Sequence, residues 1–523
     1  MPWLPGVVAF ACILENRRMN RYLNYLKRNG ISDTYYAVKE RLKLRRGPAY
    51  SYVSPGAAEL ERQRGESEGL QERPLIGVVM PAYNTPAGFL REAVDSVVRQ
   101  SYPDWRLVIS DASDQDCVER IAGEYSGDPR IIYLKLNENR GISANTNEGV
   151  TEALKSVNGR ACDYIALLDH DDVLTPDALY HMAMAIMDPD QKNRPRDPDQ
   201  KNRLRDPDQK PALLYSDEDK MTADEASGSV MYFDDHIKYK FNYDLILSNN
   251  YICHLMLIRR DIAAKIRFRS EYDGAQDYDL VLSTIRLLCG HGDEPVSDPI
   301  PVTELDNQIV HVTRVLYHWR SHAGSTATNT ASKYYAYEAG REALREHIRV
   351  MYGENAGDVR HSRHLGFYNI VWGQSSAGDT GQAKPERSGS AVAASDRQKS
   401  GNPSKEDIDT YISGIFAIRS DIGAVAVRVF DRHGRMSECI ADENGNWLYS
   451  GTFKHYAGRF NRFDCAQDVA FADIRYIRVR PELMDLHREY MDRIRETGDH
   501  VSISREFAEK IKENGYMIMY IPV

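Results

Sequence analysis

Between Leu75 and about Val350, short apolar runs alternate with segments whose apolar residues recur at helical spacing. Strands are predicted over 76–80, 106–110, 130–136, 163–168 and 212–215. Helices are predicted between them, over 87–100, 115–125, 143–156 and 176–187. Strands that alternate with helices are typical of a mostly parallel sheet with helices on its faces, so the pattern predicts an α/β fold.

Two polar segments divide the chain. Residues 188–210 repeat the sequence DPDQK and carry almost no apolar side chains, which favours a disordered surface insertion over a docking segment. Residues 374–407 are rich in Ser, Gly, Ala, Lys and Asp without periodicity, as in a linker. We therefore expect a helical basic arm at 1–72, the main α/β domain at 73–350, a linker at 351–410 and a smaller α/β domain at 411–523.

The composition is that of a globular protein, with 42% hydrophobic and 28% charged residues in a chain of 523. Its seven cysteines are scattered without a C-x-x-C pair, which fits a reducing compartment. The apolar run at 3–14 is shorter than the ~20 residues that span a bilayer and lacks the flanks of a signal peptide. These features predict a cytoplasmic location.

A basic segment stands out against the net charge of −10. Residues 17–46 hold ten Lys or Arg and only two acidic residues, together with several Tyr and Leu. Such a segment suits either the anionic inner face of the plasma membrane or a helical arm packed on its own domain. We expect no nucleic-acid partner.

The strongest chemical signal is the sequence LDHDD at 168–172, directly after a predicted strand. Three clustered carboxylates repel one another, a cost that is understandable if a cation lies among them. Asp169 and Asp171 can bind one Mg²⁺ or Mn²⁺ and the ribose and phosphates of a nucleotide. An Asp cluster after a strand is by itself more often a capping device, so the neighbouring motifs decide the interpretation.

Three neighbouring motifs each follow their own strand. The turn PAYN at 81–84 (Pro81, Tyr83 and Asn84) lies where ligands bind in open α/β sheets. Asp111 ends the next strand and can accept a hydrogen bond from a base or a ribose. In ENRGISANTNEG at 138–149, which includes Asn145, Arg140 can meet phosphate and Gly141 permits close approach. Because the three motifs occur in chain order and each follows its own strand, together they favour a nucleotide-binding site over three unrelated turns.

These motifs closely resemble those of the family-2 glycosyltransferases of the GT-A fold, in particular bacterial, rhamnosyltransferase-like members that build surface polysaccharides. The resemblance covers about residues 74–340, and its blocks occur in the expected order. Further blocks are LLYSDEDK at 213–220, SNNYICHLMLIRR at 248–260, GAQDYDL at 274–280 and VLYHWRSHAGSTA at 315–327.

The resemblance implies roles for several residues. Asp277 lies at the place of the family's general base, although many relatives have Glu before the Asp where this chain has Gln276; Asp279 is the competing candidate. His318 is a candidate metal ligand, with a packed, hydrogen-bonded side chain as the alternative. Asp217, Glu218 and Asp219 are candidates for contacts with donor or acceptor hydroxyls. Asp219 and His254 are weaker candidates for binding the acceptor, with a solvated acidic turn and a histidine at the edge of the core as the alternatives.

The resulting prediction is an inverting transfer of a sugar from a UDP-, dTDP- or GDP-linked donor to a glycan or lipid-linked acceptor, with Mn²⁺ or Mg²⁺ as cofactor. A non-catalytic sugar-binding protein on the same scaffold is the alternative, and a nucleotidyltransferase is disfavoured because PAYNTPAG carries no basic phosphate-binding residue. The segments 421–440 and 513–523 resemble the later half of a second such module. That half lacks the donor-binding motifs, so we expect it to be catalytically silent.

Overall fold

The structure is a computed structural model of the chain. It describes residues 50–187, 210–223, 229–292, 299–321, 334–373, 404–454 and 456–523, with isolated positions at 26, 31, 34, 35, 38 and 39. The predicted surface insertion, except for Lys210, and nearly all of the basic segment 17–46 lie outside the described residues.

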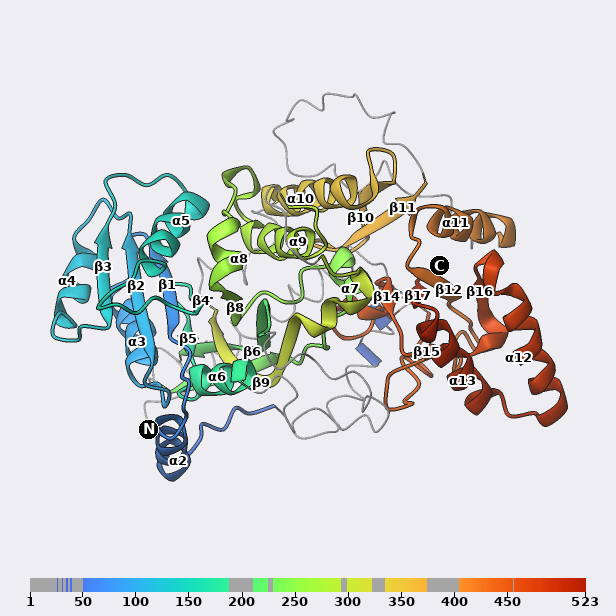
Figure 1. The fold of residues 1–523 in the computed structure, drawn as a ribbon, viewed down its shortest axis with the longest axis horizontal. Coiled ribbons are helices and arrows are strands. Elements are labelled where there is room, and N and C mark those ends of the chain that lie inside the picture. Colours follow the sequence, from blue (N-terminus) through green and yellow to red (C-terminus); the bar gives the residue numbers. More distant parts are fainter. Residues whose placement is uncertain are drawn as a thin grey trace, which may run out of the picture.

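Four parallel strands form the first half of a nine-stranded sheet, in the order β3-β2-β1-β4. The strands are β1 (Ile76–Ala82), β2 (Trp105–Asp111), β3 (Ile131–Lys135) and β4 (Tyr164–Leu167). The helices between them are α3 (Ala87–Val98), α4 (Cys117–Glu124) and α5 (Ile142–Ala153). Because helices cover this part of the sheet, β1 and β2 are apolar and buried along most of their length, as the sequence predicts (Figure 1).

The second half of the sheet is mixed and continues from β4 in the order β8-β6-β9-β5, with β7 on β6. Its strands are β5 (Val173–Leu174), β6 (Leu213–Ala223), β7 (Val230–His236), β8 (Met256–Arg259) and β9 (Ile309–Arg320). Strand β8 is antiparallel to both β4 and β6, whereas β6 and β9 are parallel. The associated helices are α6 (Ala178–Met187), α7 (Tyr243–Ser248), α8 (Arg260–Lys265), α9 (Gln276–Leu288) and α10 (Tyr334–Tyr352).

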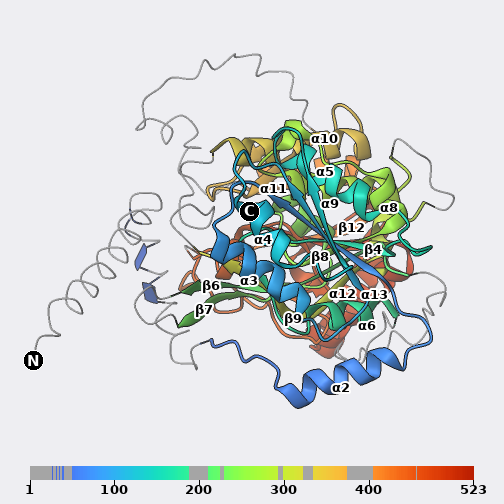
Figure 2. The same cartoon turned by 90° about the vertical axis from the view of Figure 1, so that its left-hand side faces the viewer.

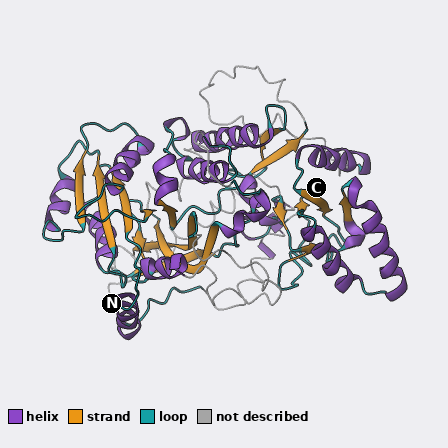
Figure 3. Ribbon diagram, in the orientation of Figure 1, coloured by secondary structure: helices purple, strands orange, loops and turns teal. Residues whose placement is uncertain are grey.

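The carboxyl-terminal part has its own sheet in the order β14-β17-β12-β16, with helices α12 and α13 at the outer end of the molecule (Figure 3). Its main elements are α11 (Lys405–Ile418), β12 (Ile422–Val427), β14 (Gln467–Asp468), β16 (Ile477–Val479), α12 (Met484–Thr497), α13 (His500–Glu513) and β17 (Met517–Ile521). The short strands β13 (Ile440–Ala441) and β15 (Phe471–Ala472) form a separate pair. This part therefore contains strands and helices, as predicted.

The two parts share one apolar core. Ile415, Ile422 and Met519 belong to the same buried cluster as Val79 of β1. The segment predicted as a linker, 351–410, contains part of this packing, because β10 (Gly357–His361) and β11 (Tyr368–Trp372) form a hairpin against it. Residues 374–403 of that segment lie outside the described residues.

A buried cation joins the two parts. Arg419, at the end of α11, is fully buried and forms ion pairs of 2.6 Å with Asp244 of α7 and with Asp421. Its guanidinium also lies over three aromatic rings, those of Tyr243, Tyr352 and Trp372. An arginine with two carboxylate partners satisfies most of its hydrogen-bonding capacity away from water.

Within the amino-terminal arm, α2 (Ala57–Glu68) lies beside the sheet domain (Figure 2). Gln63 accepts a 2.7 Å hydrogen bond from Ser101, and Glu66 accepts one from Tyr180 of α6. Among the described residues, no helix is both long enough and apolar enough to cross a bilayer.

Candidate active site

The turn after β1 takes a conformation that few residues tolerate. Asn84 has a positive φ of 48°, and its backbone N–H donates a 2.8 Å hydrogen bond to Ser113 Oγ beyond the end of β2. The buried side-chain oxygens of Asn84 and Thr85 have no partner within the described chain. Pro81 is partly buried within β1, and Tyr83 is 44% exposed. The turn therefore offers unpaired acceptors beside the strand ends.

Asp111 is buried at the end of β2 and already makes three contacts. It accepts hydrogen bonds from the Ser113 N–H at 2.8 Å, from Tyr133 OH at 2.7 Å and from Lys135 Nζ at 3.0 Å. A carboxylate has about four acceptor positions, so one remains for a ligand. Tyr133 and Lys135 of β3, which the sequence analysis did not single out, thus set the orientation of this group.

The loop before α5 is fixed by its own amides. Asn145 Nδ2 donates to Asn139 Oδ1 at 2.8 Å, and the Arg140 N–H donates to Asn145 Oδ1 at 3.3 Å. The Arg140 side chain is half exposed and pairs with Glu148 at 2.6 Å. Gly141 has a φ of 92°, and a Cβ there would lie 2.6 Å from an Asp273 oxygen, so this position requires glycine.

The acidic segment after β4 carries negative charge that few protein groups balance. Burial, together with the charges of Asp169 and Asp171, raises the pKa of Asp172 well above its ordinary value, against hydrogen bonds from Tyr317 OH at 2.6 Å and the Arg320 N–H at 2.7 Å. Burial also raises the pKa of Asp169, where His254 opposes the effect and Asp171 and Asp277 add to it. Asp277, about a hundred residues further along the chain, therefore lies within electrostatic range of the acidic segment.

Asp277 begins α9 as a partly buried side chain. Its Oδ2 accepts a 3.0 Å hydrogen bond from Asn250 Nδ2, a residue the sequence analysis gave no role. The competing candidate, Asp279, is buried and pairs with Arg269 and Arg286, so its charge is used within the protein. Of the two, Asp277 is the one whose charge acts on Asp169.

Strands β6 and β9 present two chemically distinct faces. Their register pairs Glu218 with Tyr317 and Asp219 with His318, and successive side chains point to opposite faces. Tyr317 stacks on His254 with centroids 4.6 Å apart and reaches Asp172, so its face belongs to the acidic segment. Glu218, rather than the predicted Asp219, shares this face.

The opposite face holds Asp219 and His318 together. His318 Nδ1 lies 2.6 Å from Asp219 Oδ1, and Tyr50 OH donates to Asp219 Oδ2 at 2.7 Å. Both side chains are almost completely buried. The structure therefore brings His318 to Asp219 instead of to Asp169 and Asp171, where the sequence analysis expected it as a metal ligand.

The donor set fits a divalent cation that is shared with a substrate. Within the described ranges, no three or more His, Cys, Asp or Glu side chains form a metal-binding group of their own. Mg²⁺ is commonly held by one or two carboxylates together with substrate phosphates. Asp169 and Asp171, with the raised pKa of Asp169, match that arrangement better than a fully protein-built site.

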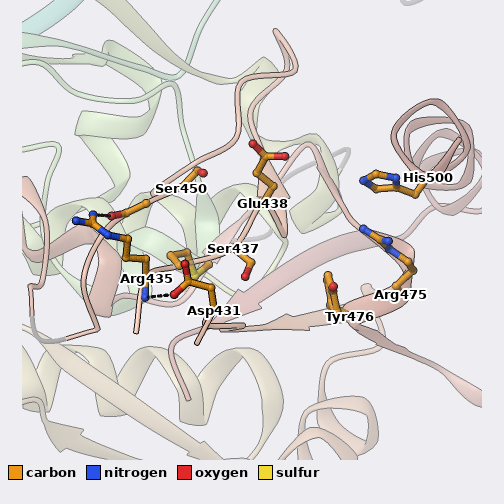
Figure 4. A pocket seen from close by; sticks show the side chains of 10 residues that line it. Asp431, Arg435, Ser437, Glu438, Ser450, Arg475, Tyr476 and His500 are labelled. Carbon is orange, nitrogen blue, oxygen red and sulfur yellow. Dashed lines mark hydrogen bonds between the residues drawn. The ribbon is translucent and has the colours of Figure 1, made fainter. Parts of the chain in front are cut away.

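A cavity of about 380 Å³ lies elsewhere, in the carboxyl-terminal part (Figure 4). Its polar lining includes Arg435, Glu438, Arg475 and His500, and none of the predicted site residues borders it. This cavity is thus separate from the acidic segment at the end of β4.

Comparisons with known proteins agree with these motifs. The family model for glycosyl transferase family 2 matches residues 77–267. An uncharacterized protein of Sinorhizobium fredii, y4gI, is 34% identical over 55% of this chain and 27% of its own length. The O-antigen biosynthesis protein RfbC of Myxococcus xanthus is 31% identical over 55% of this chain and 19% of its own length. The chain thus spans about a quarter or less of these relatives.

Among solved structures, S. aureus TarS residues 1–349 in complex with UDP is 16% identical, with a TM-score of 0.33 over 52% of this chain and 65% of that one. The order of sheet strands and helices over the matched residues is that of the predicted GT-A fold. The family match and the curated relatives show that residues 77–267 of the chain are similar to glycosyl transferase family 2.

Proposed function

We propose that the chain transfers a sugar from a nucleotide diphosphate donor to a hydroxyl group of a growing glycan or lipid-linked acceptor, with inversion at the anomeric carbon. The observation that carries the proposal is the position of Asp277: it begins α9, yet it lies within electrostatic range of Asp169 and is oriented by Asn250. A site with acidic residues for a donor and a separate carboxylate for an acceptor suits a displacement reaction.

The donor side of the site is built from the ends of β1, β2 and β4. In our proposal, the unpaired acceptors at Asn84 and Thr85 and the remaining acceptor position of Asp111 bind the nucleoside. Arg140, which now holds Glu148 in an exposed pair, is free to exchange that partner for a phosphate because exposed ion pairs contribute little stability.

Asp169 and Asp171 would hold a divalent cation against the diphosphate. When bound, such a cation neutralises charge on the departing nucleoside diphosphate. The raised pKa of Asp169 supports this assignment, since a carboxylate surrounded by negative charge is stabilised by a positive ligand.

The chain's own chemical contribution is made by Asp277. Its carboxylate accepts the proton of the acceptor hydroxyl as that oxygen forms a bond to the anomeric carbon, and the carbon–diphosphate bond breaks on the opposite face. Asn250 fixes the orientation of Asp277 through the 3.0 Å hydrogen bond to Oδ2.

The relatives suggest the biological setting. RfbC carries the description O-antigen biosynthesis, and TuaG of Bacillus subtilis, 35% identical over 20% of this chain and 40% of its own length, that of putative teichuronic acid biosynthesis. We therefore propose a surface polysaccharide as the product.

The test is a panel of UDP-, GDP- and dTDP-linked sugars with Mn²⁺, in which released nucleoside diphosphate is measured for the wild type and Asp277→Asn. We expect turnover by the wild type and a loss of about 100-fold to 10,000-fold in the variant, with donor affinity retained. Asp261→Asn is the matched control, because Asp261 also lies in the first turn of a helix but pairs with the exposed Arg259. Equal turnover by the wild type and Asp277→Asn would refute the base assignment, and donor binding without release would favour a sugar-binding protein.

A further inference from the structure

Glu218 of β6 is a buried carboxylate with one oxygen unused. The residue is 9% exposed, and its Oε1 lies 3.1 Å from His236 Nδ1. Its Oε2 forms an ion pair with Lys238 Nζ at 3.5 Å, but this buried oxygen accepts no hydrogen bond within the described chain. A buried acceptor that lacks a donor is costly unless a ligand supplies one.

The unused oxygen belongs to the face that carries the proposed chemistry. Glu218 pairs in register with Tyr317, whose ring stacks on His254. The charges of both Asp277 and Glu218 act on the partly buried thiol of Cys253, so this thiol lies near both carboxylates. Glu218 and Asp277 therefore approach the same region from different elements.

The surroundings of Glu218 keep it ionised. Burial opposes ionisation, but the positive charge of Lys238, with the hydrogen bond from His236, lowers the pKa of Glu218 well below its ordinary value. A carboxylate held at low pKa is a poor base and a good hydrogen-bond acceptor. Glu218 is thus suited to bind a hydroxyl group, whereas proton removal remains with Asp277.

The carboxyl-terminal part supplies the second support of Glu218. A turn at 458–464 brings Arg462 Nη2 to 3.3 Å from His236 Nε2 and 3.0 Å from the Ile237 carbonyl oxygen. The same turn places the Phe460 ring against the His236 ring in a tilted contact, with centroids 4.0 Å apart. Guanidinium groups only donate, so Nε2 of His236 accepts and its proton is on Nδ1, where it is donated to Glu218. Burial, aided by the charges of Lys238 and Arg462, lowers the pKa of His236 and favours this neutral form.

We propose that Glu218 binds a hydroxyl group of a sugar in the transfer site, and that the turn at 458–464 positions it through His236. The inference rests on the proposed function, and it makes the carboxyl-terminal part a working component of that site. A sugar hydroxyl is the expected ligand because it supplies the single neutral donor that Oε2 lacks.

The first experiment compares wild type with Glu218→Gln by calorimetry, with the UDP-linked sugar that gives the highest turnover among UDP-linked donors and with UDP alone. If the donor sugar is the ligand, affinity for the nucleotide sugar falls roughly 10-fold to 100-fold while affinity for UDP is unchanged. If the acceptor sugar is the ligand, both affinities hold and KM for an octyl glycoside acceptor rises by a similar factor. Unchanged values in all three measurements would overturn the inference.

A second variant guards against misfolding. Glu218→Asp keeps the charge but withdraws the oxygens by one methylene, so it should show the same selective loss. The melting temperature of each variant is measured. If Glu218→Gln does not fold, the same measurements are made on Glu218→Asp. Wild-type protein without nucleoside diphosphate release would instead defeat the proposed function itself, and wild-type turnover with no selective loss in either variant defeats only the role of Glu218.

The positioning role of the turn is tested by a matched pair of arginines. Arg462→Ala should raise by about 10-fold whichever constant Glu218→Gln raises, the dissociation constant of the donor or the KM for the acceptor, with kcat within about 2-fold, because only the position of Glu218 changes. Arg459→Ala is the control: it lies in the same turn and contacts Asp235 of β7, but no hydrogen bond links it to His236. Equal values of that constant for the two variants would overturn the positioning role.

His236 provides a rescue. His236→Asn retains a donor near the place of Nδ1 and should keep the same constant near its wild-type value, whereas His236→Leu should reproduce the effect of Glu218→Gln. If His236 were purely structural, either both variants would show the raised constant or only His236→Leu would keep the wild-type value. Either result would contradict the proposed contacts from Arg462 through His236 to Glu218.

Discussion

The large sheet carries two acidic segments, residues 217–219 in β6 and residues 169–172 after β4. Their carboxylates have different partners within the protein. On β6, each acidic residue has a basic or hydroxyl partner: Asp217 contacts His311 at 2.8 Å, Glu218 contacts His236, and Asp219 contacts His318 and Tyr50. After β4, no ion pair within the described ranges reaches the carboxylates of Asp169 or Asp172.

The difference shows in the direction of the pKa values. Burial acts on both segments, but Lys238 and His236 lower the pKa of Glu218, whereas neighbouring carboxylates raise the pKa of Asp169 and Asp172. Charged partners within the protein keep a buried carboxylate ionised, whereas a buried carboxylate beside others of like charge is stabilised by a bound cation. Counting acidic residues in the sequence does not separate these two cases.

The largest expected effect is on catalysis. Asp169→Asn should lower kcat/KM by about 100-fold to 1,000-fold, because a group that stabilises developing charge is lost. Its free energy of unfolding should stay constant or rise, since the substitution removes a partly buried charge that lies beside other carboxylates. Steady-state kinetics and urea unfolding measure the two quantities. A variant that is both active and destabilised would mean that Asp169 is a structural residue like Asp219.

Ligand-induced stabilisation sharpens the same contrast. At 100 times the dissociation constant, Mn²⁺ with UDP should stabilise the wild type by about 2.7 kcal/mol. Asp169→Asn should lose most of this gain, whereas Asp219→Asn should keep it. Thermal unfolding at increasing UDP concentration gives the comparison. An equal gain in stability for all three proteins would show that Asp169 does not bind the cation.

Substitutions in the segment 217–219 of β6 should instead change the free energy of unfolding. Asp219→Asn weakens the contacts to the buried His318 and to Tyr50, and should lower the free energy of unfolding by about 1–3 kcal/mol. Urea unfolding at pH 7 is the measurement, with Glu443→Gln, an exposed partner of Lys240, as the control. A neutral effect would show that the Asp219–His318 pair does not contribute to the fold.

The smallest effect concerns pH. The pKa of Glu218 is lowered in the folded state, so its contribution to stability is present above its unfolded pKa of about 4.3 and is lost as pH falls towards the folded value. The wild type should exceed Glu218→Gln in stability by on the order of 1 kcal/mol at pH 7, and the difference should shrink below about pH 4. Lys238, His236 and His254 are the charged or titratable groups that act on Glu218. A difference that grows at low pH would contradict the assigned direction.

The first half of the sheet was predictable from the sequence. Strands β1, β2 and β4 are largely buried apolar runs, β3 is an apolar run that is only partly buried, and the helices between them follow amphipathic patterns, so the predicted ranges agree with the structure within a few residues. Local periodicity is sufficient here because each strand is covered by helices. Strands β8 and β9 were quoted only as motif blocks, because MLIR is short and β9 mixes apolar with basic residues.

The arrangement of the site was less predictable. Which face His318 occupies depends on the register of β9 against β6, two strands about a hundred residues apart, and a shift of one residue reverses the faces. The same register decides that Glu218, and not Asp219, accompanies Tyr317. Asn250 gave no local signal either, since it reaches Asp277 only after α9 has packed.

The burial of Arg419 restricts how the two parts of this chain can be recombined with parts of other proteins. Removing the chain after residue 403 would leave Asp244 as an isolated buried carboxylate, a loss on the order of 3–5 kcal/mol. A chimera with a carboxyl-terminal part from another protein therefore needs an arginine whose guanidinium lies among these three aromatic rings. Without it, Asp244 must be replaced by a neutral residue.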